Sequence, residues 1–62
     1  MSMLEDPNPM VRHEAAVALG EIGDLSAMDQ LIKATSDDST EVAASAKYAM
    51  QKILMRNMDA AA

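Results

Sequence analysis

Apolar residues recur every three or four positions along most of the chain, and no stretch alternates apolar and polar residues as a half-buried strand does. This spacing predicts a single all-α domain with helices at about 9–22, 25–35 and 40–56, followed by a frayed tail at 57–62. The predicted inward-facing residues are Val11, Ala15, Ala18, Leu19 and Ile22 in the first helix, Leu25, Met28, Leu31, Ile32 and Thr35 in the second, and Val42, Ala46, Ala49, Met50 and Ile53 in the third.

Local signals mark the ends of the first two helices. Asn8 can cap the first helix, and Pro9 suits its first position because the proline lacks an N–H that would be unsatisfied there. Gly23 can adopt the left-handed conformation that ends many helices. Either Asp24 or Ser26 can then cap the second helix.

The third helix is bounded by weaker signals. The polar run at 36–39 interrupts the apolar pattern, so we expect the helix to begin after Ser39. Lys52 and Arg56 suit the negative end of a helix dipole, and we therefore expect the helix to end near Arg56.

The first and third helices repeat one another. A shift of 31 residues, from Asp6 to Asp37, superimposes the turn, the cap and the apolar stripe. A repeating helix pair cannot bury both of its apolar faces alone, and this chain holds only about one and a half such units, so we expect further repeats or self-association to cover it. The matched positions are Asp6 with Asp37, Asn8 with Ser39, Val11 with Val42, Ala15 with Ala46, Ala18 with Ala49, Leu19 with Met50 and Ile22 with Ile53.

Composition limits the size of the core. Among 62 residues there are seven methionines and one aromatic residue, Tyr48, and cysteine, tryptophan and phenylalanine are all missing. A chain of this length buries only about 60% of the surface that its unfolded form exposes. The lack of cysteine excludes disulfides, thiolate zinc sites and thiol nucleophiles, which leaves association as the remaining means of enlarging the core.

Charge narrows the choice of partner. The formal net charge is −5, which disfavours a nucleic-acid partner because that affinity depends on clustered lysine and arginine. No stretch approaches the ~20 apolar residues that cross a bilayer, and the first residues lack the features of a signal peptide. We therefore expect a cytoplasmic protein with no membrane or nucleic-acid partner.

The run DPNPMVRHEAAVALGEIGD at residues 6–24, and more loosely residues 37–54, resembles HEAT-like repeats of the E-Z or phycobilin-lyase type. The valine-arginine pair typical of that family is present at Val11-Arg12 but is Val42-Ala43 in the later unit. The resemblance implies an α-α superhelix, or solenoid, that acts in protein–protein interaction or scaffolding. It also implies that the helices at 9–22 and 40–56 line the concave, ligand-binding side.

A helical wheel places His13 and Gly20 opposite the predicted core stripe, on the side that a solenoid presents to a partner. The exposed aromatic ring of Tyr48 either anchors a partner or covers the end of the chain. The predicted partner-binding residues are Arg12, His13, Val17, Gly20, Tyr48 and Gln51, accompanied by Ala16 and Ala44.

The segment PMVRHEAA at 9–16, followed by Ala18-Leu19-Gly20, is also similar to the His-Glu repeats of deoxyhypusine hydroxylase. That enzyme's His-Glu pairs hold a di-iron centre, which implies His13 and Glu14 as metal ligands. The alternative is that His13 is a solvated helix residue and Glu14 a helix former. We favour a non-enzymatic binding module without catalytic residues or cofactor, and keep as the alternative a fragment of such an iron oxygenase.

Overall fold

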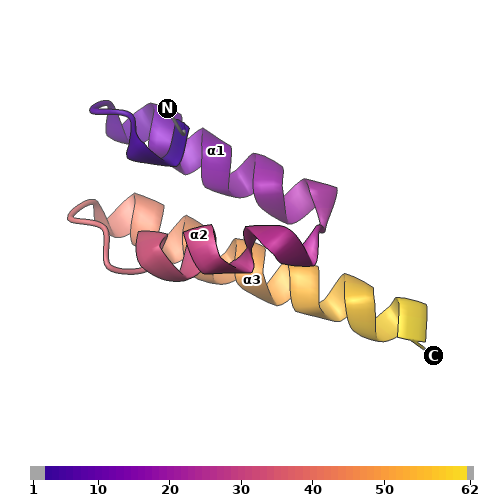
Figure 1. Cartoon of the computed structure of the whole chain (residues 1–62). Coiled ribbons are helices and arrows are strands. Elements are labelled where there is room, and N and C mark those ends of the chain that lie inside the picture. Colours follow the sequence, from indigo (N-terminus) through magenta and orange to yellow (C-terminus); the bar gives the residue numbers. More distant parts are fainter. Residues whose placement is uncertain (1–2, 62) are drawn as a thin grey trace.

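A computed structural model describes residues 3–61 of the chain, with side chains up to residue 58. The described residues are almost entirely helical and contain no strand, which confirms the predicted all-α fold (Figure 1). None of these helices is both long enough and apolar enough to span a lipid bilayer. The elements are the short 3-10 helix η1 (Met3–Glu5), α1 (Pro9–Ile22), the 3-10 turn η2 (Leu25–Ala27), α2 (Met28–Ala34) and α3 (Thr40–Ala61).

The helices α1 and α3 run side by side in the same direction, and α2 runs antiparallel to both (Figure 1). Contacts between α1 and α3 advance together along the two helices, from His13 with Ser45 near their starts to Glu21 with Lys52 farther on. The two helices thus occupy equivalent positions in successive units, as the 31-residue shift predicts. The result is an elongated molecule of 39 × 21 × 15 Å that comprises about one and a half helical hairpins.

The predicted helix ends are confirmed for α1. Asn8 accepts a hydrogen bond from the backbone N–H of Met10 at 2.9 Å, and Pro9 is the first helical residue. Gly23 has φ 75° and ends the helix in the left-handed conformation, which glycine adopts without steric cost. Of the two predicted caps for the next segment, Asp24 is the one used, and it accepts from the backbone N–H of Ser26 at 2.9 Å.

The predicted end of the third helix is wrong, because α3 continues to Ala61 rather than ending near Arg56. Arg56 does not serve the end of its own helix. It donates to the backbone carbonyl of Glu21, while the side-chain amide of Asn57 donates to the carbonyl of Gly23 at 3.2 Å. These bonds satisfy carbonyls at the end of α1 that have no partner within that helix. The last residue of the predicted frayed tail, Ala62, lies outside the described residues.

The core lies where α2 and α1 both pack on α3. The predicted inward stripe of α3 is confirmed, with Met50 only partly buried at its edge. In α2 the centre of the contact is Leu31, whereas Leu25 and Ile32 are each about half exposed, contrary to prediction. The buried apolar residues are Ala16, Ala27, Leu31, Ala34, Val42, Ala46, Ala49 and Ile53.

The predicted orientation of α1 is wrong. Ala16 and Gly20 face α3 and are buried, whereas Ala18 is exposed and Ile22 is 67% exposed. A Cβ atom on Gly20 would lie 2.9 Å from both Cα and Cβ of Ala49, which shows how closely the two helices approach. Two small residues permit this approach, so the helix turns its small side toward α3 and leaves its bulkier apolar side facing outward.

Candidate protein-binding surface

Arg12 was predicted to bind a partner, but its guanidinium is engaged within the molecule. Nε lies 2.8 Å from Oδ2 of Asp37 and Nη2 lies 3.0 Å from Oδ1, while Nη1 donates to the backbone carbonyls of Asp6 and Pro7 at 2.7 and 3.1 Å. The hydrogen bond from Arg12, together with the one from the backbone N–H of Ser39, lowers the pKa of the Asp37 carboxyl. Arg12 therefore joins one helical unit to the next.

His13 and Gly20 also face inward in this structure, which corrects their predicted exposure. His13 is half-buried, and its Nδ1 lies 2.5 Å from the hydroxyl oxygen of Ser45 on α3. Gly20, like Ala16, is buried where α1 meets α3. The cause is the rotation of α1 described above, since the side predicted to face a partner is the side that packs on the next helix.

Three of the predicted binding residues, Val17, Tyr48 and Gln51, are exposed, as is the accompanying Ala44. Val17 is 40% exposed and Tyr48 is 61% exposed, and they occupy equivalent positions on the two parallel helices. One helical turn beyond them, Glu21 and Lys52 form an ion pair with 2.5 Å between Nζ and Oε1. Because residues four apart share one side of a helix, Val17 and Tyr48 lie on the same surface as this pair.

We call this region the tyrosine surface and define it by Val17, Glu21, Tyr48, Gln51 and Lys52. The ammonium of Lys52 lies 5.6 Å from the centroid of the Tyr48 ring, within the range of a cation–π interaction. The hydrogen bond from Lys52 lowers the pKa of Glu21. The surface thus combines one aliphatic side chain and one aromatic side chain with a single ion pair of opposite charges.

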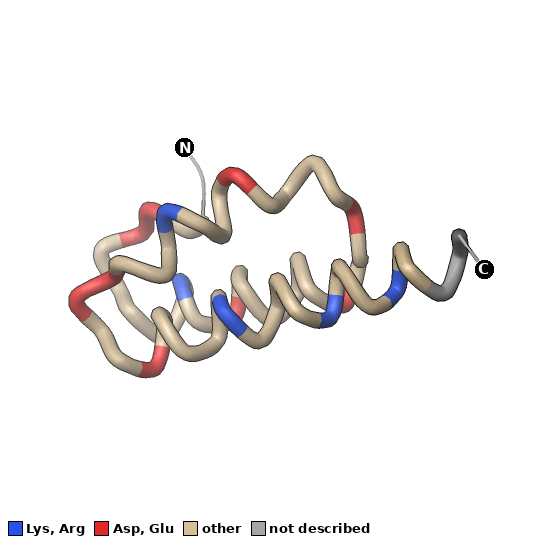
Figure 2. The backbone as a smooth tube through the Cα atoms, turned by 90° about the horizontal axis from the view of Figure 1, so that it is seen from below, with Lys and Arg blue, Asp and Glu red and all other residues tan. Residues whose placement is uncertain are grey.

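Charge is unevenly distributed around this surface. Figure 2 shows acidic residues gathered at the end of the molecule where α1 and α3 begin, and basic residues spaced along α3. Glu21 and Lys52 were not predicted as members of the surface. The signal was present, because the 31-residue shift places Lys52 on Glu21 and so predicts opposite charges at neighbouring, equivalent positions.

Among the described residues, the predicted metal ligands His13 and Glu14 are not joined by further ligands. One ring nitrogen of His13 is bonded to Ser45, Glu14 is exposed, and the equivalent residues of α3 are Ala44 and Ser45. In the part of the chain that the structure describes, no three histidine, cysteine or carboxylate side chains come together as a metal would require. One imidazole and one carboxylate leave most of the coordination positions of an iron ion to other ligands.

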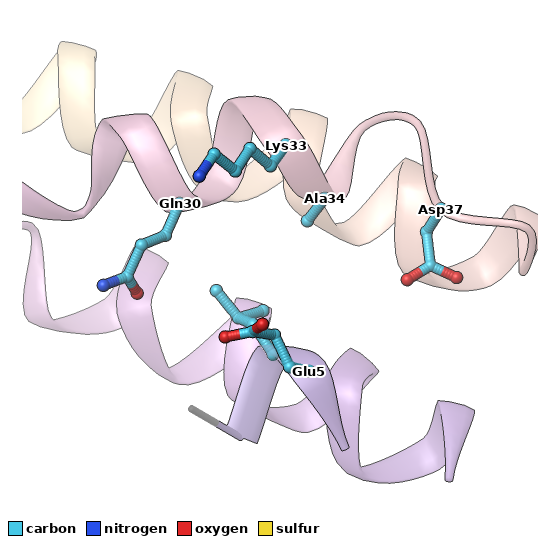
Figure 3. Close-up of a pocket in the computed structure, with 6 residues that line it drawn as sticks. Glu5, Gln30, Lys33, Ala34 and Asp37 are labelled. Atoms are coloured by element: carbon cyan, nitrogen blue, oxygen red, sulfur yellow. The ribbon is translucent and has the colours of Figure 1, made fainter. Parts of the chain in front are cut away.

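A hollow of about 420 Å³ lies between η1 and α2, away from the tyrosine surface (Figure 3). Glu5 enters it from η1, while Gln30 and Lys33 enter it from α2. It is open to solvent, and the polar groups that line it are carboxylates, an amide and an ammonium. Leu4, Ala34 and Asp37 complete its lining.

The arrangement of the chain defines its class. Two equivalent helices lie parallel, an antiparallel helix stands between them in sequence, and an arginine links successive units. These are the features of a stacked helical-repeat protein, an α-solenoid. The chain belongs to the family of HEAT repeats, whose pattern matches residues 1–61.

Individual relatives share part of this sequence. Over 34 residues, or 55% of the chain, it is 53% identical to a deoxyhypusine hydroxylase of Saccharomyces cerevisiae, and over 55 residues, or 86% of the chain, it is 40% identical to a deoxyhypusine hydroxylase of Gallus gallus. The matched segments represent 10% and 18% of those proteins. The chain therefore corresponds to a small part of each.

Proposed function

We propose that this chain is a non-enzymatic helical-repeat module that binds a protein partner through the tyrosine surface. The observation that carries the proposal is the exposure of Tyr48, the single aromatic residue of the chain, beside Val17 and the Glu21–Lys52 ion pair. Stacked helical repeats present extended binding surfaces. Membership of the HEAT family supports this general role.

The chemistry of the tyrosine surface favours a polypeptide partner. Tyrosine offers a large apolar ring with little conformational entropy to lose, and it is enriched among the residues that dominate binding energy at protein interfaces. The neighbouring charges of Glu21 and Lys52 can pair with charges of either sign at the rim of such an interface. Gln51 adds an amide that donates and accepts hydrogen bonds.

The test compares two substitutions that remove exposed apolar surface at different places. Partners captured by the chain from its source cells are purified, and their dissociation constants are measured for the unaltered chain, Tyr48→Ala and Ile32→Ala. Tyr48→Ala should weaken binding at least about tenfold, whereas Ile32→Ala, at a half-exposed position on α2, should leave it unchanged. Equal affinities for all three chains would contradict the proposal.

Self-association, a cytoplasmic location and a lack of nucleic-acid and membrane partners remain predictions. Support for self-association comes from apolar side chains that are more than half exposed at the end of α1 and along the last turns of α3, namely Ile22, Met55 and Met58. Exposed apolar side chains of this size favour burial by another chain.

A second candidate function is favoured by the similarity to two deoxyhypusine hydroxylases. In this alternative the chain is part of an iron oxygenase, and His13 and Glu14 supply one ligand pair while the other ligands lie elsewhere. The chain is incubated with ferrous iron, desalted and assayed for metal. Under the first proposal it retains none. Stoichiometric iron that is lost in His13→Ala would favour the alternative.

A further inference from the structure

The outward side of α3 carries a second regular pattern, about half a turn around the helix from its buried stripe. Steps of four and three residues alternate along it, which is the spacing of the a and d positions in a coiled coil. All its members are exposed, and Tyr48, Met55 and Met58 are each more than 60% exposed. We call this line the α3 seam and define it by Ala44, Tyr48, Gln51, Met55 and Met58.

This side of α3 differs from the side of α1 that packs on the next unit. Where α1 has Ala16 and Gly20, which let α3 approach closely, α3 has Lys47 and Gln51. The long side chains of Lys47 and Gln51 would hold another helix of the array at a greater distance. The α3 seam therefore fits a partner of a different kind.

The charged residues that α3 places beside its seam are all basic. Between residues 42 and 58 the helix carries Lys47, Lys52 and Arg56 and no acidic residue, in a chain whose net charge is −5 (Figure 2). Lys47 and Lys52 flank the seam, at the g and e positions of this spacing. Lys52 is paired with Glu21, whereas Lys47 is exposed and has no ion pair with any described residue. The charge around the seam therefore favours a partner that carries carboxylates.

We propose that the α3 seam binds an amphipathic helix of another protein, with apolar residues at the same alternating spacing and acidic residues on either side of them. The inference rests on the proposed function and identifies the partner of the tyrosine surface, which shares Tyr48 and Gln51 with the seam. The apolar side chains of this helix pack on Tyr48 and Met55, as knobs of one helix enter holes of the other. Its carboxylates pair with Lys47 and join Glu21 at Lys52.

The α3 helix of a second copy does not have the chemistry that the seam requires. In a parallel pair, the g position of one helix faces the e position of the other, so Lys47 would face Lys52 of the second copy and repel it. In an antiparallel pair centred on the seam, residues 42–58 would offer neither lysine a carboxylate. An acidic helix from another protein supplies the missing charge.

The test uses two synthetic peptides of three heptads each, with leucine at every a and d position. One has glutamate and the other has lysine at every e and g position. Their dissociation constants for the full 62-residue chain are measured by fluorescence anisotropy. The glutamate peptide should bind at least about tenfold more tightly. The net charge of −5 on the whole chain would favour the lysine peptide, so this preference has to come from the basic residues of α3.

Two substitutions on α3 test the apolar and the charged contacts separately. Met55→Gln places an amide in the seam without changing the charge, and it should weaken binding of the glutamate peptide at least about fivefold. Lys47→Glu should reduce the preference for the glutamate peptide at least about fivefold. Ile32→Gln and Lys33→Glu, at exposed positions on α2, are the matched controls and should change each constant by less than about twofold.

Equal affinities for the two peptides, or tighter binding of the lysine peptide, would overturn the inference. So would binding of the glutamate peptide that neither Met55→Gln nor Lys47→Glu weakens. A chain that binds phosphatidylserine vesicles and neither peptide would assign the seam to a lipid surface instead. A dimer of the chain that Met55→Gln dissociates would assign it to a second copy.

The proposed function is tested separately by Tyr48→Ala and the captured partners. Partners that lose affinity in Tyr48→Ala but not in Met55→Gln or Lys47→Glu would overturn this inference and leave the proposed function standing. Partners that lose affinity in all three variants would support both.

Discussion

At the scale of single residues, Gly20 sets the distance between α1 and α3. The helix passes so close to Ala49 that there is no room for a methyl group on Gly20. Glycine is otherwise unfavourable inside a helix by roughly 1 kcal/mol relative to alanine. Its presence here is explained by the contact it permits and not by any need for an unusual backbone conformation, since the positive φ belongs to Gly23.

Gly20→Ala should therefore destabilise the protein despite the better helix propensity of alanine. We expect a net loss of about 1–2 kcal/mol in the free energy of unfolding, because the added Cβ pushes against backbone atoms of Ala49. Denaturant unfolding followed by circular dichroism measures it. Gln51→Ala, at the exposed and equivalent position of α3, should change stability by less than about 0.5 kcal/mol. A more stable Gly20→Ala variant would refute the close contact.

The ion pair of Arg12 and Asp37 predicts a dependence of stability on pH. The pKa of Asp37 is lowered from its usual 3.8, so the carboxylate stabilises the folded state above that value, and this stabilisation is lost as the pH falls below 3.8 toward the folded-state pKa. Asp37→Asn keeps an acceptor for Ser39 but removes the charge. Its melting temperature should be lower than that of the unaltered chain at pH 7, on the order of 5 °C.

This difference should shrink as the pH falls below 3.8, since Asp37 of the unaltered chain then becomes neutral as well. Thermal melts between pH 2 and 7 measure both quantities. Asp38→Asn, at an exposed neighbour without an ion pair to any described residue, should leave the melting temperature at pH 7 unchanged. A difference between Asp37→Asn and the unaltered chain that persists at low pH would refute the role of the charge.

At the scale of elements, the last turns of α3 supply hydrogen-bond donors for carbonyls at the end of α1. Arg56 and Asn57 donate to carbonyls at the end of α1, and the amide of Asn57 also donates to the Ile53 carbonyl at 2.7 Å. The two bonds of Asn57 are half-buried, so the carbonyls of Gly23 and Ile53 are partly shielded from the water that would otherwise satisfy them. The last turns of α3 are thus part of the fold.

Asn57→Ala should cost about 1 kcal/mol in the free energy of unfolding, because it leaves the Gly23 carbonyl without its side-chain partner. Met58→Ala, which removes a 70% exposed side chain one position later, should cost less than about 0.5 kcal/mol. Amide hydrogen exchange should show faster exchange in the last turn of α1 for Asn57→Ala only. Equal effects of the two substitutions would mean that α3 does not cap α1.

The helix boundaries that sequence predicts correctly are those with a local cause. Asn8, Pro9 and Gly23 act through their own backbone and side chain, so their roles follow from residue type. The orientation of α1 has no such local cause. Its apolar and small residues at 15–20 surround most of the helix, so a helical wheel defines no single stripe, and the close fit of Gly20 on Ala49 decides the orientation.

At the scale of the whole molecule, the 31-residue shift predicts which helices are equivalent and that they stack, and the parallel packing of α1 and α3 agrees with it. The binding surface is less predictable. Arg12 and His13 have the chemistry of binding residues, yet they are used between units, because Asp37 and Ser45 come from a distant part of the sequence. Tyr48 remains available, since it is 61% exposed, with the ammonium of Lys52 5.6 Å from its ring centroid.

The whole molecule should associate with itself at micromolar concentration, since apolar side chains remain exposed at the end of α1 and along α3. Sedimentation velocity over a hundredfold range of concentration should show a sedimentation coefficient that rises with concentration. A single monomeric species that also melts cooperatively would contradict this expectation. In that case the small apolar core would be sufficient to keep a single chain folded without association.

The parallel course of α1 and α3 has a consequence for longer assemblies. Helices that point the same way add their peptide dipoles, whereas the antiparallel α2 opposes them. Both parallel helices have an acidic residue near their positive start, Asp6 and Asp37, but the cation at the negative end of α1 is Arg56 of the next helix, α3. The dipole of α1 is therefore compensated between units and not within one, so an added hairpin would need a cation from its neighbour at the same place.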